Sequence, residues 1–126
     1  MIFGIGIDVV ENARIADSIR RHGDRFLERV YQTAELEYCR SMTDPIPHFA
    51  ARFAAKEAVS KAFGTGFAQN VSWKEIEVRR KASGAPFIVL HTAAEDLARS
   101  LGITAVHISL SHSQNYAVAN ALLVKE

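Results

Sequence analysis

Residues 48–63, HFAARFAAKEAVSKAF, predict a long helix with very small side chains along one of its sides. At about 100° per residue, that side is made of alanines. They are Ala50, Ala51, Ala54, Ala55, Ala58 and Ala62. Side chains of this size allow unusually close packing, so we expect this side to lie against a sheet. Together with the strands and hairpin predicted further along the chain, the segment predicts an α+β fold in which a long central helix packs on an antiparallel sheet.

The opposite side of this helix mixes charges with aromatic rings. It carries Arg52, Lys56, Glu57, Ser60 and Lys61, interleaved with Phe49 and Phe53. Glu57 and Lys61 are four residues apart and could form an ordinary ion pair on an exposed helix. Aromatic side chains among the charges argue against a face that is simply solvated. A surface ion pair and a functional face both remain open at this point.

The N-terminal run, GIGIDVV at residues 4–10, predicts a strand. Alternation places Gly4, Gly6 and Asp8 on one face of this strand. Two glycines weaken a strand, so their use indicates close approach by another backbone or by a ligand. Asp8 is a carboxylate in an apolar run, where it must be paired, metal-bound or at a wet end. Alternatively, Asp8 and Glu11 could form a capping box for the next helix.

The rest of the chain divides into short helices and strands. We expect helices over 11–22, 26–30, 33–41 and 92–101, strands over 73–80 and 87–90, and a hairpin of 105–110 with 116–124. Thr33 is the expected cap of the third helix, and Thr92 with Glu95 forms a capping box for the last. Residues 43–47 should be a loop, because two prolines exclude helix there. With no internal repeat or linker, residues 1–126 form one domain.

Composition excludes several classes of protein. The 126 residues carry a net charge of +1, which gives no reason to expect nucleic acid or a membrane as partner. The single cysteine excludes an internal disulfide. No stretch approaches the roughly 18 apolar residues of a membrane span. We therefore expect a cytosolic globular protein.

Asp8 and Glu57 are acidic residues in otherwise apolar elements, and they suggest a metal site. Two converging carboxylates suit a hard cation such as Mg²⁺, which keeps several waters and binds substrate phosphates. Zinc fits poorly, since the five histidines show no close pair. Lys61, together with Arg52 and Lys56, would supply positive charge for a pyrophosphate. The residues thus predict a metal-assisted site for a phosphorylated ligand, without naming that ligand.

Four blocks of sequence carry a family resemblance. They are GIGIDVVENARI (4–15), RFAAKEAVSKAFGTGF (52–67), SGAPFIVL (83–90) and ISLSHSQNYAVANALL (108–123). In this order and spacing they resemble the holo-[acyl-carrier-protein] synthases, the small bacterial type of 4′-phosphopantetheinyl transferase. The resemblance covers nearly the whole chain.

The resemblance implies a reaction and roles for the acidic pair. The phosphopantetheine arm of coenzyme A would move to a serine of apo acyl carrier protein in cytoplasmic fatty acid biosynthesis, releasing adenosine 3′,5′-bisphosphate. Asp8 and Glu57 would bind Mg²⁺, and Lys61 would neutralise the pyrophosphate or the leaving group. The general base stays open between Lys61, Glu57 and a metal-bound water.

Further residues follow from the same resemblance. Positions that would contact coenzyme A, besides Lys61, are Arg52, Gly64, Gly66, Gly84, Pro86 and His112. An arginine stripe, which we define as Arg14, Arg21 and Arg25, would face the acidic carrier protein; a plain solvated face is the alternative. The family is typically homotrimeric, with active sites between subunits. A coenzyme A-binding module without catalysis is the main alternative function, and a small RNA-binding protein is a weaker one.

Overall fold

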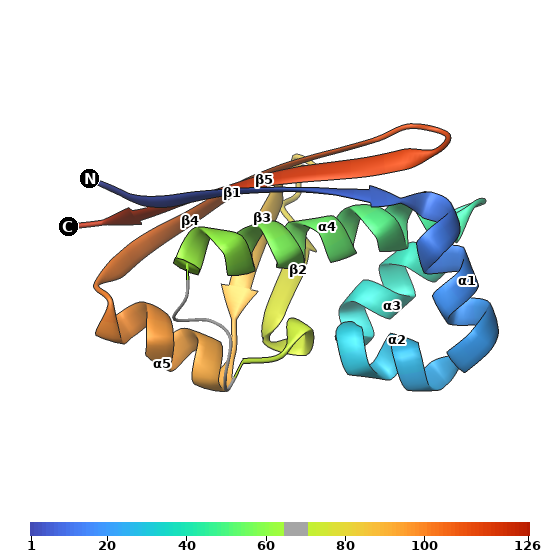
Figure 1. The fold of residues 1–126 in the computed structure, drawn as a ribbon, viewed down its shortest axis with the longest axis horizontal. Helices are drawn as coiled ribbons and strands as arrows, with labels where there is room; N and C mark the ends of the chain where they lie inside the picture. Colours follow the sequence, from blue (N-terminus) through green and yellow to red (C-terminus); the bar gives the residue numbers. More distant parts are fainter. Residues whose placement is uncertain (65–70) are drawn as a thin grey trace.

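The computed structural model describes residues 1–64 and 71–126 and has a mixed α and β architecture (Figure 1). Its elements are β1 (Ile2–Glu11), α1 (Asn12–His22), α2 (Asp24–Val30), α3 (Thr33–Arg40), α4 (Pro45–Phe63), the 3₁₀ turn η2 (Trp73–Glu75), β2 (Ile76–Arg80), β3 (Pro86–Leu90), α5 (Thr92–Ser100), β4 (Ile103–His112) and β5 (Tyr116–Lys125). This order confirms the predicted α+β class.

Two antiparallel sheets flank the central helix. The larger has the strand order β1-β5-β4, and the smaller pairs β2 with β3. Helix α4 runs along one face of the larger sheet, with α1, α2 and α3 gathered at one end and α5 with the smaller sheet at the other (Figure 1). Within the described ranges, no helix is both long and apolar enough to cross a membrane.

The alanine side of α4 packs on β1 at backbone distance. All six alanines are buried. A Cβ added at Gly4 would lie 2.1 Å from the carbonyl oxygen of Ala62, and one added at Gly6 would lie 1.9 Å from that of Ala58. No side chain fits in that space. The two strand glycines therefore make room for the backbone of α4. Of the two predicted reasons for these glycines, another backbone or a ligand, the structure shows the first.

The start of α4 corrects the prediction that residues 43–47 form a loop. The helix begins at Pro45, and Pro47 lies in the same first turn. The first N–H groups of a helix have no intrahelical partner, so proline costs nothing at this position. The Asp44 carboxylate accepts a hydrogen bond from the Ile46 N–H at 3.3 Å and caps the turn.

Two predicted caps are also wrong by one residue. Gln32, not Thr33, is the N-cap of α3, and it forms a capping box with Glu35. His91 precedes α5 as its N-cap without a side-chain bond, while Thr92 takes a positive φ of 44°. Thr92 donates instead to the Glu75 carboxylate at 2.7 Å, a contact made from a distant part of the chain.

The charged side of α4 is not a solvated face. Lys56 is fully buried and donates to Glu35 Oε1 at 2.9 Å, to the Ile76 carbonyl at 2.6 Å and to the Trp73 carbonyl at 3.2 Å. Helix α3 and the η2–β2 segment cover the part of this side around Lys56 and exclude water from it. Lys56 is thus a core residue, and the expectation that it neutralises a pyrophosphate is wrong.

Candidate active site

Asp8 is paired with a lysine across the contact between β1 and α4. The Lys61 Nζ donates to Asp8 Oδ1 at 3.0 Å and to the Ile7 carbonyl at 3.0 Å. The Asp8 side chain is 16% exposed and that of Lys61 57%. No side-chain cap forms at the start of α1, so the alternative capping role of Asp8 and Glu11 is not realised. Asp8 is held by a flexible, half-exposed cation.

Glu57 lies one turn before Lys61 on α4 and interacts with Asp8. Burial raises the pKa of Glu57, and the negative charge of Asp8 raises it further. A hydrogen bond with the Trp73 side chain and the charge of Lys61 act in the opposite direction. Among the described side chains, Lys61 forms its ion pair with Asp8 and not with Glu57. The two carboxylates are thus close enough to interact, and Lys61 is a neighbour of both.

This acidic pair has the donor chemistry of a magnesium site. Its ligand atoms are carboxylate oxygens, and a cation between them would relieve the repulsion that raises the pKa of Glu57. The described residues contain no cluster of three or more histidine, cysteine or acidic side chains. Two carboxylates therefore fit a cation that keeps open positions for water or substrate, and not a closed protein cage.

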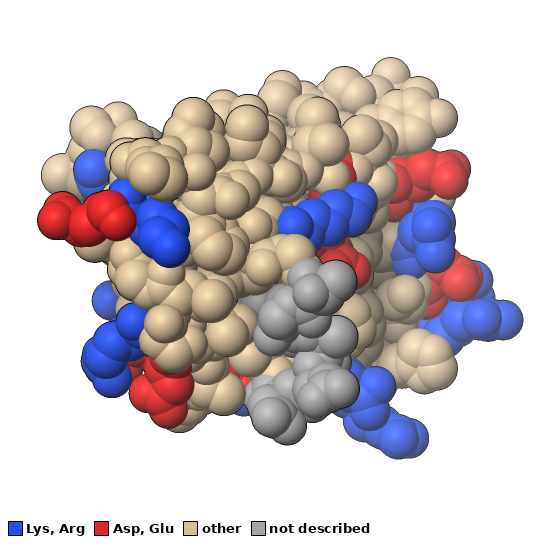
Figure 2. All heavy atoms as spheres, turned by 60° about the vertical axis from the view of Figure 1, so that its left-hand side comes forward, with Lys and Arg blue, Asp and Glu red and all other residues tan. Residues whose placement is uncertain are grey.

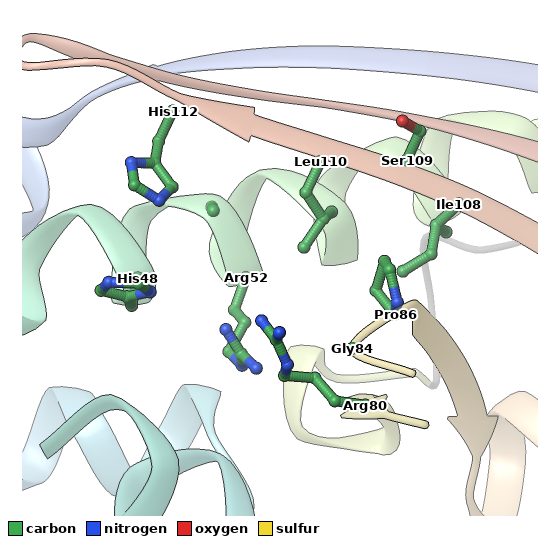
Figure 3. A pocket seen from close by; sticks show the side chains of 10 residues that line it. His48, Arg52, Arg80, Gly84, Pro86, Ile108, Ser109, Leu110 and His112 are labelled. Atoms are coloured by element: carbon green, nitrogen blue, oxygen red, sulfur yellow. The ribbon is translucent and has the colours of Figure 1, made fainter. Parts of the chain in front are cut away.

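A second group of predicted residues lines a cavity of about 290 Å³ (Figure 3). Helix α4, the turn between β2 and β3, and strand β4 contribute its walls. The lining residues are His48, Ala51, Arg52, Arg80, Gly84, Pro86, Ile108, Ser109, Leu110 and His112. Neither aspartate nor glutamate is among them, so the two arginines lack a carboxylate partner in this wall. We call this space the cationic cavity.

The charges in the cationic cavity are not neutralised. Arg52 is only 3% exposed, and its Nε has no hydrogen-bond partner within the described residues. Burial lowers the pKa of His48, and the neighbouring His112, Arg52 and Arg80 lower it further, while the charge of Asp44 acts in the opposite direction. Positive groups collected in this way favour an anion such as a phosphate.

The turn of Gly84 and Pro86 shapes the edge of this cavity. Gly84 has φ 94°, a conformation that favours glycine, and its N–H donates to the Lys81 carbonyl at 2.8 Å. A Cβ at Gly84 would lie 3.1 Å from an Arg80 guanidinium nitrogen. The glycine therefore allows both the turn and the approach of Arg80.

The two groups do not form one site within a single chain. Asp8, Glu57 and Lys61 are absent from the lining of the cationic cavity. Arg52 and Glu57 are five residues apart on α4, which turns their side chains about 140° from each other. Gly64 ends α4 with φ 78° directly after this segment. Gly66 lies outside the described residues.

Two basic members of the cationic cavity, Arg80 and His48, were not predicted from the sequence. Arg80 ends the strand that leads into the turn already singled out, so its position next to Gly84 was a usable signal. His48 carried no such signal, because its partner His112 lies far along the chain. Their rings lie 5.0 Å apart between centroids.

The arginine stripe is solvent-exposed on α1 and α2. Arg21 makes a loose contact of 3.7 Å with Asp17, which also pairs with Arg20. Within the described ranges, Arg14 and Arg25 have no ion pair. A shallow groove of about 200 Å³ beside the stripe is lined by His22, Arg25, Phe26 and Arg29. This surface of α1 and α2 is therefore partly basic and partly apolar.

The outer face of the larger sheet is apolar and uncovered. Ile5, Ile7 and Val9 of β1 are 65%, 61% and 60% exposed. Figure 2 shows that the upper part of the molecule, where this sheet lies, is almost free of charged side chains. An exposed apolar sheet face of this kind marks an interaction site.

Known proteins match the chain along nearly its whole length. The family model of the 4′-phosphopantetheinyl transferase superfamily matches residues 4–121. A holo-[acyl-carrier-protein] synthase of Koribacter versatilis is 51% identical, with 98% of each chain covered. One of Chlamydia trachomatis is 48% identical, covering 96% of this chain and 98% of the relative.

Solved structures agree with the sequence comparison. The holo-[acyl-carrier-protein] synthase of Neisseria meningitidis has a TM-score of 0.91 and 34% identity, covering 99% of this chain and all of that one. That of Helicobacter pylori, in complex with coenzyme A, has a TM-score of 0.84 and 32% identity, covering 95% of this chain and 99% of that one. The chain therefore belongs to the 4′-phosphopantetheinyl transferase superfamily, as an enzyme whose relatives are holo-[acyl-carrier-protein] synthases.

Proposed function

We propose that this protein transfers the 4′-phosphopantetheine group of coenzyme A to a serine hydroxyl of apo acyl carrier protein, in the cytoplasm and for fatty acid biosynthesis. The observation that carries the proposal is the cluster of Asp8, Glu57 and Lys61 at the contact of β1 with α4. The complex of the Helicobacter pylori relative with coenzyme A supports the choice of donor.

The proposed reaction is a single displacement at phosphorus. The serine Oγ attacks the β-phosphorus of coenzyme A, and an Oγ–P bond forms as the bond between this phosphorus and the bridging oxygen breaks. The bridging oxygen leaves with its electron pair as part of adenosine 3′,5′-bisphosphate. The serine proton passes to a base. Positioning and charge neutralisation account for most of the rate in such a transfer.

The residues of the acidic pair have separate tasks in this scheme. Asp8 and Glu57 would hold Mg²⁺, which neutralises charge on the pyrophosphate when bound. The Lys61 ammonium is half exposed and lies beside Asp8, from where it would contact the pyrophosphate or the leaving phosphate. Glu57 and Lys61 are the chain's candidate acceptors for the serine proton.

The cationic cavity is the proposed site for the nucleotide end of coenzyme A. This end carries a 3′-phosphate, a dianion outside the pyrophosphate. Arg52, Arg80 and His112 would bind it, with Gly84 and Pro86 beside the nucleotide. The lack of a carboxylate in the wall supports this assignment, because an internal acid would compete with the phosphate.

A complete site would require two subunits. The acidic pair and the cationic cavity do not meet in one chain, and the apolar outer face of β1 is uncovered. We propose a homotrimer in which the cationic cavity of one subunit faces Asp8, Glu57 and Lys61 of the next. The arginine stripe and its groove would then dock the acidic carrier protein beside each site.

The test is the intact mass of apo acyl carrier protein after incubation with this protein, coenzyme A and Mg²⁺. A gain of one phosphopantetheine, abolished by a chelator and strongly reduced in Asp8→Ala and Glu57→Ala, is expected. No gain with several carrier proteins, while coenzyme A still binds, would contradict the transferase and favour a coenzyme A-binding module instead.

A further inference from the structure

We propose that Tyr38 is a positioning residue that holds the cations of the cationic cavity in place for the 3′-phosphate of coenzyme A. Tyr38 does not line the cavity. It lies behind it on α3, half-buried, and contacts three of the groups that do. The inference rests on the proposed function, since it concerns how the same cavity binds its ligand.

Two guanidinium groups pack against the Tyr38 side chain. The Arg52 guanidinium carbon lies 4.1 Å from the ring centroid, and that of Arg80 lies 5.0 Å from it. Both distances fall within the range of cation–π attraction. Arg80 Nη1 also donates a hydrogen bond to the Tyr38 hydroxyl oxygen at 2.7 Å. One neutral side chain thus holds arginines that come from α4 and from β2.

Tyr38 also supports the histidines of the cavity. Its ring meets the His48 ring edge-on, with 5.9 Å between centroids and an interplanar angle of 78°. His48 meets His112 in the same manner at 5.0 Å and 65°. The three rings form a row from α3 through α4 to β4. Figure 3 shows His48, Arg52, Arg80 and His112 around the cavity that this row borders.

A neutral side chain can position the cations of an anion site better than an acidic side chain can. Burial is the main cause of the lowered pKa of His48, and the neighbouring basic groups lower it further because like charges repel. A carboxylate would hold them by neutralising them and would then compete with a phosphate. The Tyr38 ring attracts guanidinium groups without removing their charge, and the Nε of buried Arg52 is left without a hydrogen-bond partner among the described residues. The cations are therefore fixed in place and still free to bind an anion.

The experiment compares two ligands that differ by one phosphate. Adenosine 3′,5′-bisphosphate and adenosine 5′-monophosphate are titrated calorimetrically into the intact protein, with no metal added. The wild type should bind the bisphosphate more tightly. Tyr38→Phe, which loses the bond to Arg80, should weaken bisphosphate binding about 5-fold. Tyr38→Leu, which also loses the ring, should weaken it about 30-fold or more. Binding of the monophosphate should barely change.

Tyr31→Phe is the matched control. The Tyr31 hydroxyl donates to the Phe49 carbonyl at 2.8 Å in the core, and Tyr31 is not among the residues that line the cavity. Its loss should lower the melting temperature and leave bisphosphate affinity unchanged. Tyr38→Phe should instead weaken bisphosphate binding and leave the melting temperature unchanged. In transfer assays, the Tyr38 variants should raise the KM for coenzyme A with kcat nearly constant, and should lose the preference for coenzyme A over its form lacking the 3′-phosphate.

Each negative result has a separate meaning. If the wild type transfers phosphopantetheine and binds the bisphosphate, but both Tyr38 variants bind it equally well, the positioning role is wrong and the proposed function stands. If the wild type neither binds the bisphosphate nor transfers the group, the proposed function is wrong and the role of Tyr38 is wrong with it. If Tyr38→Leu does not fold, Tyr38→Phe alone decides.

Discussion

The ammonium of Lys61 lies 3.0 Å from the carboxylate of Asp8, so helix α4 and strand β1 are joined by an ion pair at the acidic pair of the site. Its exposure on the lysine side makes it weak as a stabilising contact. Because the pair lies next to Glu57, both of its charges act on the pKa of Glu57. Asp8 acts on Glu57 directly, while Lys61 partly offsets that effect.

Asp8→Asn should lower the pKa of Glu57. The negative charge of Asp8 is one of the causes that raise this pKa, and asparagine removes it at nearly constant volume. A pH titration of the Glu57 carboxyl carbon by NMR measures the change. Transfer activity should fall by about 100-fold or more, because one cation ligand is lost. An unchanged Glu57 titration would mean that the two carboxylates do not interact.

Glu57→Gln should abolish transfer and yet stabilise the fold at neutral pH. The pKa of Glu57 is raised in the folded state, so the folded protein binds more protons than the unfolded chain, and stability falls as pH rises through that pKa. Glutamine removes this dependence. The melting temperature of the variant should exceed that of the wild type at pH 7, and the difference should disappear below the ordinary pKa of a glutamate. A variant less stable at pH 7 would contradict this reasoning.

Gly6→Ala should destabilise the protein strongly. The new Cβ would lie 1.9 Å from the Ala58 carbonyl oxygen, so strand and helix must separate, at a cost of about 3 kcal/mol or more. Urea unfolding measures the loss. Gly102→Ala is the matched control: nothing lies within 4 Å of its Cβ, and only its φ of 76° opposes the substitution, at about 1 kcal/mol. Equal losses in the two variants would argue against close backbone packing.

Lys56→Met should cost about 3–5 kcal/mol, because it leaves the buried Glu35 carboxylate without its cation. Lys56→Met combined with Glu35→Gln should recover part of that loss, since the charge is removed as well. Denaturant unfolding of the single and double variants forms the cycle. If the double variant loses the sum of both single losses, the two residues do not act as a pair.

Ile7→Glu should disrupt the proposed trimer. The side chain is 61% exposed on the outer face of the larger sheet, where a subunit interface would have to desolvate the new charge. Sedimentation velocity should show a shift from trimer to monomer and a loss of transfer activity. Ser100→Glu, on exposed α5, serves as the control and should leave both unchanged. A wild type that sediments as a monomer would contradict the homotrimer.

Local patterns in the sequence predicted most of the helices and strands, although residues 73–75 form a 3₁₀ turn and not the start of a strand. Alanines at helical spacing predicted close packing on a sheet, and glycines at strand spacing predicted a close approach, because small residues allow backbones to touch. Asp8 and Glu57 could be recognised because each is an acid in an apolar element. The prolines at 45 and 47 misled the prediction because their cost depends on where the helix begins, and the cap supplied by Asp44 sets that point.

The sequence by itself determined the α+β class and the close packing of the alanine side of α4 on a sheet. It also singled out Asp8 and Glu57, since each of these conclusions depends on patterns within single elements. Only the tertiary structure decided which charges of α4 are free. Lys56 and Lys61 look alike in sequence, but α3 and η2 bury the first against Glu35, while the second reaches Asp8 at the surface. The cationic cavity likewise depends on segments distant in the chain, because Tyr38, Arg80 and His112 meet only when the chain is folded.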